Sequence, residues 1–255
     1  MTDTHCHLYL NEFQEDLEQV LDRAVTAGVR QIFMPAITLG SFTAMQKMQH
    51  PGIGFFCMAG IHPCEITSGN ADDLSRLQDL ASTGQCAGIG ETGLDYYRSK
   101  EFMAEQKTSL IRHCEIAKAV KKPVILHNRN STSDLLDIVE QQQDGHLTGI
   151  WHCFNGSEEE GKRAIDLNLY LGIGGILTFK NAGVDKTVKD LPLHRLLLET
   201  DAPYLAPHPK RGKRNEPAFI RFTASRLAEI KGRSLDEVIR QTTQNANQVF
   251  KVPLI

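Results

Sequence analysis

Short apolar runs recur along the whole chain and alternate with segments in which apolar residues have helical spacing. Near-continuous apolar runs such as Val124, Ile125 and Leu126 are typical of parallel strands that are covered on both faces. We predict eight strands, at Met1–Leu8, Val29–Ala36, Ile53–Gly60, Gln85–Gly90, Pro123–His127, Thr148–Cys153, Leu169–Gly174 and Arg195–Glu199.

The helical segments carry recognisable start and stop signals. Leu17, Val20, Leu21 and Ala24 form one apolar face, and Gly28 follows as a stop signal. Two further helices are predicted to begin with capping boxes, in which a serine is followed three positions later by a glutamate. These boxes are Ser157 with Glu160 and Ser234 with Glu237.

Eight strands that alternate with helices predict an α/β fold, a (β/α)8 TIM barrel of the amidohydrolase-like kind. The length of 255 residues fits one such barrel, whose typical size is about 250 residues. A doubly wound open sheet is the competing architecture, but it would gather functional residues at one switch point. No repeat or linker marks a second domain, so we expect residues 1–255 to form a single barrel.

Composition narrows the class of protein. The net charge of −3 and the pI near 6.4 do not indicate a nucleic-acid partner, so such a partner would need a local basic patch. No apolar stretch approaches the roughly 20 residues of a membrane span. The six cysteines form no Cys-x-x-Cys pair, and no signal-peptide pattern is present. We therefore expect reduced, buried thiols in a cytoplasmic protein without a membrane partner.

Six of the eight predicted strands have a side chain that can bind metal at or near their C-terminal end. Side chains at the carboxyl ends of barrel strands meet at one mouth, where enzymes of this fold have their active sites. Imidazole and carboxylate groups gathered there would form the site of a metal-dependent hydrolase. The candidates are His5, His7, His62, Glu91, His127, His152 and Asp201.

His5 and His7 are separated by one residue, so on a strand both side chains point to the same side. Both imidazoles could therefore reach one ion. Asp3 lies on the same face and could orient one of these ligands. Glu91 follows a strand of small residues, and its carboxylate could bridge two cations. Asp95 has either a structural or a substrate-positioning role, and the sequence does not separate the two.

Asp201 follows three leucines and could bind metal and accept a proton. Glu199 lies two residues earlier on the same strand face and could support a ligand. His62 could contact either metal or substrate, and Arg129 could hold a phosphate as a bidentate donor.

A basic run follows the strand that leads to Asp201, with four cationic residues among the six positions 210–215. This loop would lie at the mouth of the barrel, where cations could hold a phosphodiester backbone. We expect Arg211, Lys213 and Arg214 to bind substrate there.

The ligand types limit the metal and the chemistry. Imidazole and oxygen ligands suit zinc, manganese, magnesium, nickel or iron, and no thiolate narrows the choice. The sequence has no Gly-x-Ser-x-Gly motif that would support a serine nucleophile. The glycines of 172–175 lack phosphate-loop spacing and indicate tight packing in the barrel.

Taken together, these segments resemble the TatD family of metal-dependent deoxyribonucleases, within the amidohydrolase-like barrels. The match spans positions 3 to 205 in the family's order, and residues 211–217 extend it. Asn128 and Asn130 flank Arg129 where the family pattern tolerates variation. The matching segments are Asp3–Leu8, Gly60–Pro63, Gly90–Tyr97, Pro123–His127, His152–Gly156 and Leu198–Leu205.

The resemblance implies two divalent metal ions as cofactors, bridged by Glu91. We expect the first ion to be held by His5, His7 and Asp201, and the second by His127 and His152. Asp201 would accept the proton of the water that attacks phosphorus. The expected reaction is cleavage of phosphodiester bonds in DNA by a monomeric, exonucleolytic deoxyribonuclease.

Two alternatives use the same residues. An amidohydrolase-like esterase could direct the activated water at a carbonyl carbon, for example in aminoacyl-tRNA. A non-catalytic nucleic-acid-binding protein could keep the barrel and its metals for stability. A purely structural site would not need an open mouth with spare carboxylates, which argues against this second alternative.

Overall fold

The computed structural model describes residues 1–68, 71–98 and 100–252. Its strands form one eight-stranded sheet in which neighbours follow chain order, and every paired strand runs parallel to the next. The strands are β1 Thr2–Asp3, β2 Gln31–Pro35, β3 Gly54–Ala59, β4 Cys86–Asp95, β5 Val124–Arg129, β6 Gly149–Trp151, β7 Leu169–Ile173 and β8 Leu196–Leu198.

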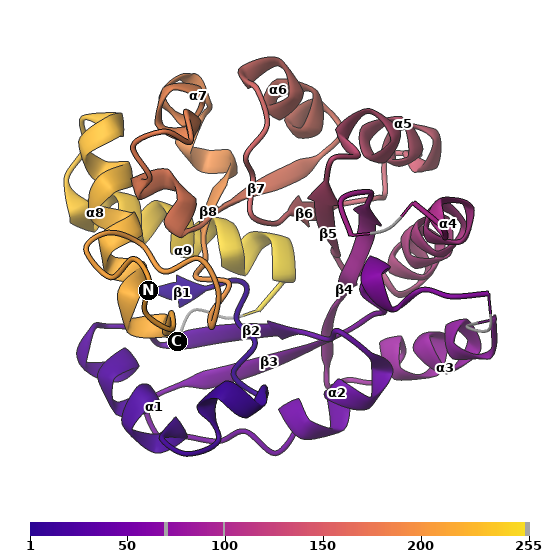
Figure 1. The fold of residues 1–255 in the computed structure, drawn as a ribbon, viewed down its shortest axis with the longest axis horizontal. Coiled ribbons are helices and arrows are strands. Elements are labelled where there is room, and N and C mark those ends of the chain that lie inside the picture. The colour runs from indigo at the N-terminus through magenta and orange to yellow at the C-terminus, as the bar shows by residue number, and fades with distance from the viewer. Residues whose placement is uncertain (69–70, 99, 253–255) are drawn as a thin grey trace.

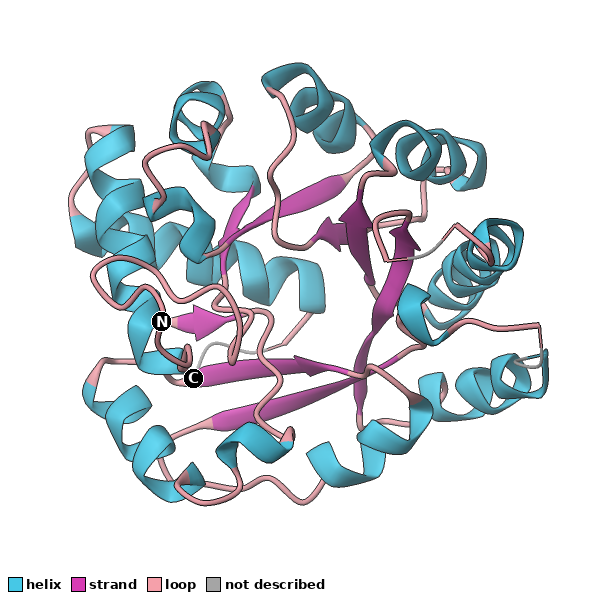
Figure 2. Cartoon of the chain, viewed as in Figure 1, coloured by secondary structure: helices cyan, strands magenta, loops and turns pink. Residues whose placement is uncertain are grey.

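Most of the helices surround this sheet on its outer side (Figures 1 and 2). Both predicted capping boxes are present, because the Ser157 and Ser234 hydroxyls each accept a hydrogen bond from the backbone N–H three residues later. The helices are α1 Leu17–Thr26, α2 Leu39–Met45, α3 Ala71–Ala81, α4 Met103–Val120, α5 Thr132–Gln142, α6 Glu158–Asp166, α7 Val184–Asp190, α8 Ile220–Lys231 and α9 Leu235–Phe250.

Backbone hydrogen bonds between the segments after β8 and β1 close the ring. Thr4 N–H donates to the Leu198 carbonyl over 3.1 Å, and His7 N–H donates to the Ala202 carbonyl over 2.8 Å. Asp201 N–H donates to the His5 carbonyl over 2.8 Å. The predicted (β/α)8 barrel is confirmed, and the open doubly wound sheet is excluded.

Alternation along the strands builds two apolar layers. One residue from each of six strands points into the barrel, and its neighbours in sequence pack against the outer helices. Helix α9 lies across the ring in Figure 1 and adds Ala246, Val249 and Phe250 to the inner layer. The inner residues of the strands are Phe33, Met58, Ile125, Ile150, Tyr170 and Leu197.

The C-terminal ends of β1 and β4 differ most from the prediction, and both affect the mouth. β1 ends at Asp3 rather than Leu8, because the next backbone N–H groups alternate between partners on β2 and on the segment after β8. β4 is longer than predicted and runs to Asp95, so Glu91 lies inside a strand rather than after it. The strand therefore fixes the direction in which the Glu91 carboxylate points.

All six cysteines are free thiols, and four of them are buried. The prediction of buried thiols is wrong for Cys64, which is exposed, and Cys153 is only half-buried. Cys64 lies in the 3-10 turn Pro63–Glu65 after β3, where the chain passes the mouth of the barrel. No helix in the described part of the chain is long and apolar enough to cross a membrane.

Candidate active site

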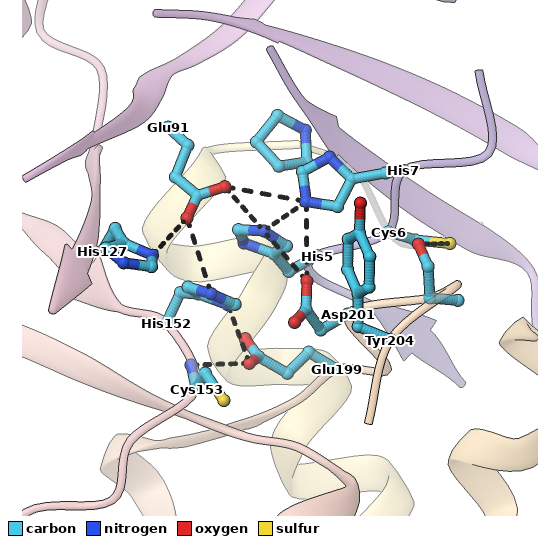
Figure 3. A network of polar contacts seen from close by, with 12 residues as sticks. His5, Cys6, His7, Glu91, His127, His152, Cys153, Glu199, Asp201 and Tyr204 are labelled. Carbon is cyan, nitrogen blue, oxygen red and sulfur yellow. Dashed lines mark hydrogen bonds and ion pairs between the residues drawn. The ribbon is translucent and has the colours of Figure 1, made fainter. Parts of the chain in front are cut away.

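Glu91 lies at the centre of the converging side chains and is 2% exposed. Its two carboxylate oxygens face different imidazoles (Figure 3). Oε2 lies 3.3 Å from His5 Nε2 and 3.6 Å from His7 Nε2. Oε1 lies 3.0 Å from His127 Nδ1 and 3.6 Å from His152 Nε2. One carboxylate therefore joins two sets of nitrogen ligands, as a bridging ligand would.

Asp201 joins the set on the Oε2 side of Glu91. Its Oδ1 atom lies 3.5 Å from His7 Nε2 and 3.8 Å from His5 Nε2. The Asp201 backbone has φ of 57° and is held by its N–H bond to the His5 carbonyl. This left-handed conformation is unusual for a residue with a side chain, and such conformations concentrate at functional sites.

The chemistry of the cluster fits divalent cations. His5 Nε2 and His7 Nε2 lie only 3.2 Å apart and both face carboxylates. Among the described residues, three groups of ligand atoms are close enough to hold an ion, with all atoms of a group within 4.8 Å of one another. They are His5 with His152 and Asp201, His5 with His7 and Glu91, and His62 with Glu91 and His127.

The pKa shifts of the buried groups also favour a site for cations. Burial opposes ionisation of Glu91 and Asp201, yet the neighbouring histidines hold the pKa of both carboxyls below the usual range. Burial likewise disfavours the His152 imidazolium, but Glu199 and Glu91 raise the pKa of His152 to about 10. Buried carboxylates that stabilise the positive charge of a neighbouring imidazolium are also suited to hold metal cations.

Two carboxylates outside the cluster determine which nitrogen of a histidine faces inward. Glu199 Oε1 lies 3.0 Å from His152 Nδ1, and Asp95 Oδ2 lies 3.1 Å from His127 Nε2. A carboxylate accepts a hydrogen bond from the ring nitrogen that bears the proton, so the other ring nitrogen keeps its lone pair for a metal. Glu199 thus supports His152, and the role of Asp95 that the sequence left open is to orient His127.

His7 obtains the same orientation from Tyr9, a residue that the sequence analysis missed. The Tyr9 hydroxyl donates to the Pro35 carbonyl over 2.9 Å, and it lies 3.0 Å from His7 Nδ1. Because its single proton goes to Pro35, the hydroxyl accepts the Nδ1–H of His7. Among the described residues, His5 Nδ1 has no such partner.

In His62 the protonated ring nitrogen faces inward, in contrast to His127 and His152. Its Nδ1 atom accepts the backbone N–H of Cys64 over 3.1 Å, so Nδ1 is the unprotonated nitrogen. Burial lowers the pKa of His62 to about 4, although Glu91 opposes this, and the ring is neutral near pH 7. The proton then lies on Nε2, which is 3.5 Å from Glu91 Oε1 and faces the cavity. Without a lone pair, this nitrogen is a hydrogen-bond donor rather than a metal ligand.

Asp3 does not orient an imidazole ring as the sequence suggested. Its carboxylate accepts hydrogen bonds from Thr200 N–H, the Thr200 hydroxyl and His5 N–H, over 2.9, 2.6 and 3.3 Å. These contacts are to backbone and hydroxyl groups, because Asp3 lies one level below the cluster. Asp3 therefore joins the segments that carry His5 and Asp201 and keeps them in register.

A cavity of about 600 Å³ opens above the cluster. Arg98 after β4 and Asn128 and Arg129 at the end of β5 line one side. Tyr204 and Leu205 after β8 and Ile176 after β7 line another. The Arg129 guanidinium lies 3.7 Å from the centre of the exposed Tyr97 ring. The sequence prediction of Arg129 at a polar mouth agrees with this position.

The basic loop lies outside that cavity, whose lining in the described structure does not include residues 211–214. Arg214 pairs with Asp16, with Nη2 2.7 Å from Oδ2, and its guanidinium also lies over the Phe13 ring. Arg211 is exposed and stacks over Phe179 at 3.7 Å, and Lys213 is exposed. The contacts of Arg214 anchor the loop to residues 13–16, just before α1, so its role in substrate binding stays a prediction.

Comparison with known proteins agrees with this geometry. A family model described as TatD related DNase matches residues 2–251. The chain belongs to the TatD family. A relative from Bacillus subtilis (strain 168), the uncharacterized metal-dependent hydrolase YabD, is 37% identical over 251 residues, which cover 98% of each protein. The 3'-5' ssDNA/RNA exonuclease TatD of Cronobacter sakazakii is 30% identical and covers 98% of this chain and 97% of its own length.

Solved structures confirm the barrel. The TatD homologue YJJV from Escherichia coli K12 has a TM-score of 0.90 and 29% identity, and covers 99% of this chain and 98% of its own. An uncharacterized amidohydrolase from Saccharomyces cerevisiae has the same fold, with a TM-score of 0.81 at 19% identity over 97% of this chain and 99% of its own. This TatD-family protein is a metal-dependent hydrolase acting on ester bonds, which excludes the non-catalytic alternative.

Proposed function

We propose that this protein hydrolyses phosphodiester bonds in DNA from an end of the strand. The central observation is that the Glu91-centred ligand cluster opens into a cavity whose wall carries Arg98 and Arg129. Two cations joined by a carboxylate suit in-line displacement at phosphorus, and guanidinium groups suit a phosphate held beside them. The exonuclease name of the Cronobacter sakazakii relative supports the same substrate class.

In this proposal, His5, His7 and Asp201 would hold one ion, His127 and His152 would hold the other, and Glu91 would be a ligand to both. Bound divalent ions supply Lewis acidity and make water a nucleophile near neutral pH. Asp201 receives the proton of the attacking water, since its neighbours keep the carboxylate ionised. His62 donates its Nε2–H to a non-bridging phosphate oxygen, where negative charge builds up.

The cationic residues would bind phosphates at different distances from the scissile bond. Arg98 and Arg129 would bind the phosphate next to the scissile bond, because both line the cavity. Arg211 and Lys213 would contact more distant phosphates, beyond the cavity. We further propose that residues 1–255 form one domain and that the enzyme is a cytoplasmic monomer.

The test is cleavage of end-labelled single-stranded DNA by metal-stripped protein to which magnesium, manganese, zinc, nickel or iron is restored separately. We expect a ladder from one end with at least one ion. Asp201→Asn should lose about a hundredfold or more in rate, as expected for a general base, with the fold intact by circular dichroism. His127→Ala should lose bound metal as well as activity.

Failure of every ion to support cleavage of DNA would refute the nuclease proposal. The same panel of ions would then be tested on aminoacyl-tRNA, because an activated water also attacks carbonyl carbon. Near-normal DNA cleavage by Asp201→Asn would leave the nuclease reaction standing but remove Asp201 as its base.

A further inference from the structure

The mouth of the barrel exposes apolar side chains that folding does not require. Among the described residues, the exposed large hydrophobic side chains are Tyr97, Tyr204 and Leu205, which are 62%, 47% and 37% accessible. Tyr204 and Leu205 line the cavity above the ligand cluster, and the half-buried Ile176 lies beside them in the lining. Exposed apolar surface gathered in a binding cavity indicates a ligand that covers it.

We term Tyr204 and Leu205 the shelf. Hydrogen bonds hold the backbone of the shelf firmly. Tyr204 N–H donates to the Asp201 carbonyl over 2.8 Å. The fully buried Asn215 amide donates to the Tyr204 carbonyl over 2.7 Å and to the Thr200 carbonyl over 2.8 Å. The shelf is therefore linked directly to the segment that carries the ligand Asp201.

The shelf also adopts a conformation that side chains rarely take. Leu205 has φ of 53°, in the left-handed region. A Cβ atom on Gly175 would lie 2.1 Å from the Leu205 carbonyl oxygen, so this close approach requires glycine at position 175. A strained backbone that presents two exposed apolar side chains is typical of a functional site rather than of a packing requirement.

The cavity thus has two chemically different walls. Arg98 after β4 and Arg129 at the end of β5 supply a cationic wall, and the shelf supplies an apolar wall after β8. Strands β4 and β8 are four places apart in the ring of eight, so these walls face each other across the ligand cluster. The Tyr204 ring meets His7 edge-on with centroids 6.2 Å apart, which places the shelf beside the reacting centre (Figure 3).

We infer that the shelf is a nucleobase subsite, which binds the unpaired base of the nucleotide next to the scissile phosphate. A base has a flat apolar face that can stack on the Tyr204 ring and Leu205, and its phosphate can reach the cationic wall at the same time. A base that is paired and stacked in a duplex cannot enter, so the substrate end must be single-stranded or frayed. This inference rests on the proposed nuclease function.

The experiment compares two single-stranded oligonucleotides that differ only at the cleaved end. One has a normal terminal nucleotide and the other has an abasic tetrahydrofuran in its place. The metal-loaded wild type should prefer the normal end in kcat/KM by about 5- to 150-fold, the range expected for one stacked base. Tyr204→Ala should bring this ratio close to one, and Tyr204→Phe should preserve it, because stacking needs the ring and not the hydroxyl.

Tyr97→Ala is the matched control, since Tyr97 is also an exposed tyrosine at the mouth but stacks with Arg129. It acts through the phosphate side, so it should lower cleavage of both oligonucleotides and leave their ratio unchanged. A second readout is the fluorescence of a terminal 2-aminopurine next to a non-hydrolysable phosphorothioate. Binding to wild type and to Tyr204→Phe should quench it, whereas binding to Tyr204→Ala should not.

The shelf assignment is overturned if wild type cleaves both ends equally, or if Tyr204→Ala keeps the wild-type ratio and quenching. In either case the cleavage itself shows that the nuclease proposal survives. Absence of cleavage of both oligonucleotides with every ion overturns the nuclease proposal and the shelf together.

Discussion

His152 donates its Nδ1–H to Glu199 over 3.0 Å, while its Nε2 atom faces Glu91 from 3.6 Å. The two carboxylates therefore contact opposite edges of one imidazole. Glu199 is fully buried, and its Oε1 atom also accepts the backbone N–H of Cys153 over 2.7 Å. This second bond fixes the carboxylate, so the orientation of His152 does not depend on a metal being present.

Replacing Glu199 should weaken metal binding without removing a metal ligand. Glu199→Gln loses the negative charge that favours Nδ1–H on His152, and we expect about 10- to 100-fold lower metal affinity. Chelator competition with a chromogenic indicator measures that affinity. Glu115→Gln is the control, since Glu115 is a half-buried glutamate whose ion pair among the described residues is with Arg112. Equal affinity of the Glu199→Gln variant and wild type would contradict this role.

The glycine beneath Glu199 offers a test of the same contact from the other side. A Cβ atom on Gly172 would lie 2.1 Å from Glu199 Oε2, so Gly172→Ala must displace the carboxylate. We expect a loss of metal affinity like that of Glu199→Gln, together with a lower melting temperature. Gly174→Ala is the matched control, because its Cβ would lie 3.7 Å from the nearest Glu199 atoms, an ordinary contact. Equal effects of the two alanines would argue against displacement of Glu199.

His62 should behave as a donor to substrate and not as a metal ligand. We expect His62→Ala to keep its metal content and to lose about 10²- to 10³-fold in kcat, the range for loss of one charge-stabilising donor. His62→Gln should recover part of that loss, because its amide N–H can still donate. Atomic emission measures the metal content of His62→Ala and of His127→Ala and so distinguishes a donor from a ligand. Loss of metal in His62→Ala to the extent seen in His127→Ala would make His62 a ligand.

The Arg214–Asp16 pair separates anchoring of the basic loop from direct substrate contact. Both side chains are about one-third exposed, so we expect the pair to contribute only about 0.2–1 kcal/mol to stability. If Arg214 acts as an anchor, Arg214→Ala and Asp16→Ala should lower kcat/KM on DNA to a similar extent, and the double variant should be no worse. Loss of activity in Arg214→Ala alone would show that this guanidinium contacts substrate.

The buried His113 should make the folded protein less stable in acid. His113 is fully buried, donates Nδ1–H to the Ser109 carbonyl over 2.7 Å and accepts Ile61 N–H at Nε2 over 3.1 Å. Burial lowers the pKa of His113 to about 4, despite the Ser109 bond. The unfolded chain binds this proton below about pH 6.5, so stability falls as pH drops from 6.5 toward 4, by about 2 kcal/mol at pH 5.

The comparison is urea unfolding of chelator-treated wild type and His113→Gln at pH 7 and pH 5. Glutamine can still accept the Ile61 N–H but does not titrate, so the variant should lose less stability between the two pH values. Other buried histidines titrate in both proteins and cancel in the difference. Parallel losses in the two proteins would contradict the assignment to His113.

The sequence by itself determined the barrel and the types of side chain at its mouth. Apolar runs such as 124–126 and 196–198 are local patterns, and their alternation with helices leaves few topologies open. In a parallel barrel every strand ends at the same face, so ligands after different strands must meet there. The boundaries of β1 and β4 were less well predicted, because they depend on which neighbouring strand supplies each hydrogen bond.

Only the tertiary structure decided what each candidate residue does. The inward nitrogen of His152 is set by Glu199, 47 positions away, and that of His127 by Asp95, 32 positions away. Arg214 forms a hydrogen bond with Asp16, which lies 198 positions away in the sequence. The role of a histidine or arginine is determined by the groups that contact it, and the folded chain brings those groups from distant segments. Residue type and spacing report which groups can react, but hydrogen-bond direction depends on distance and orientation in space.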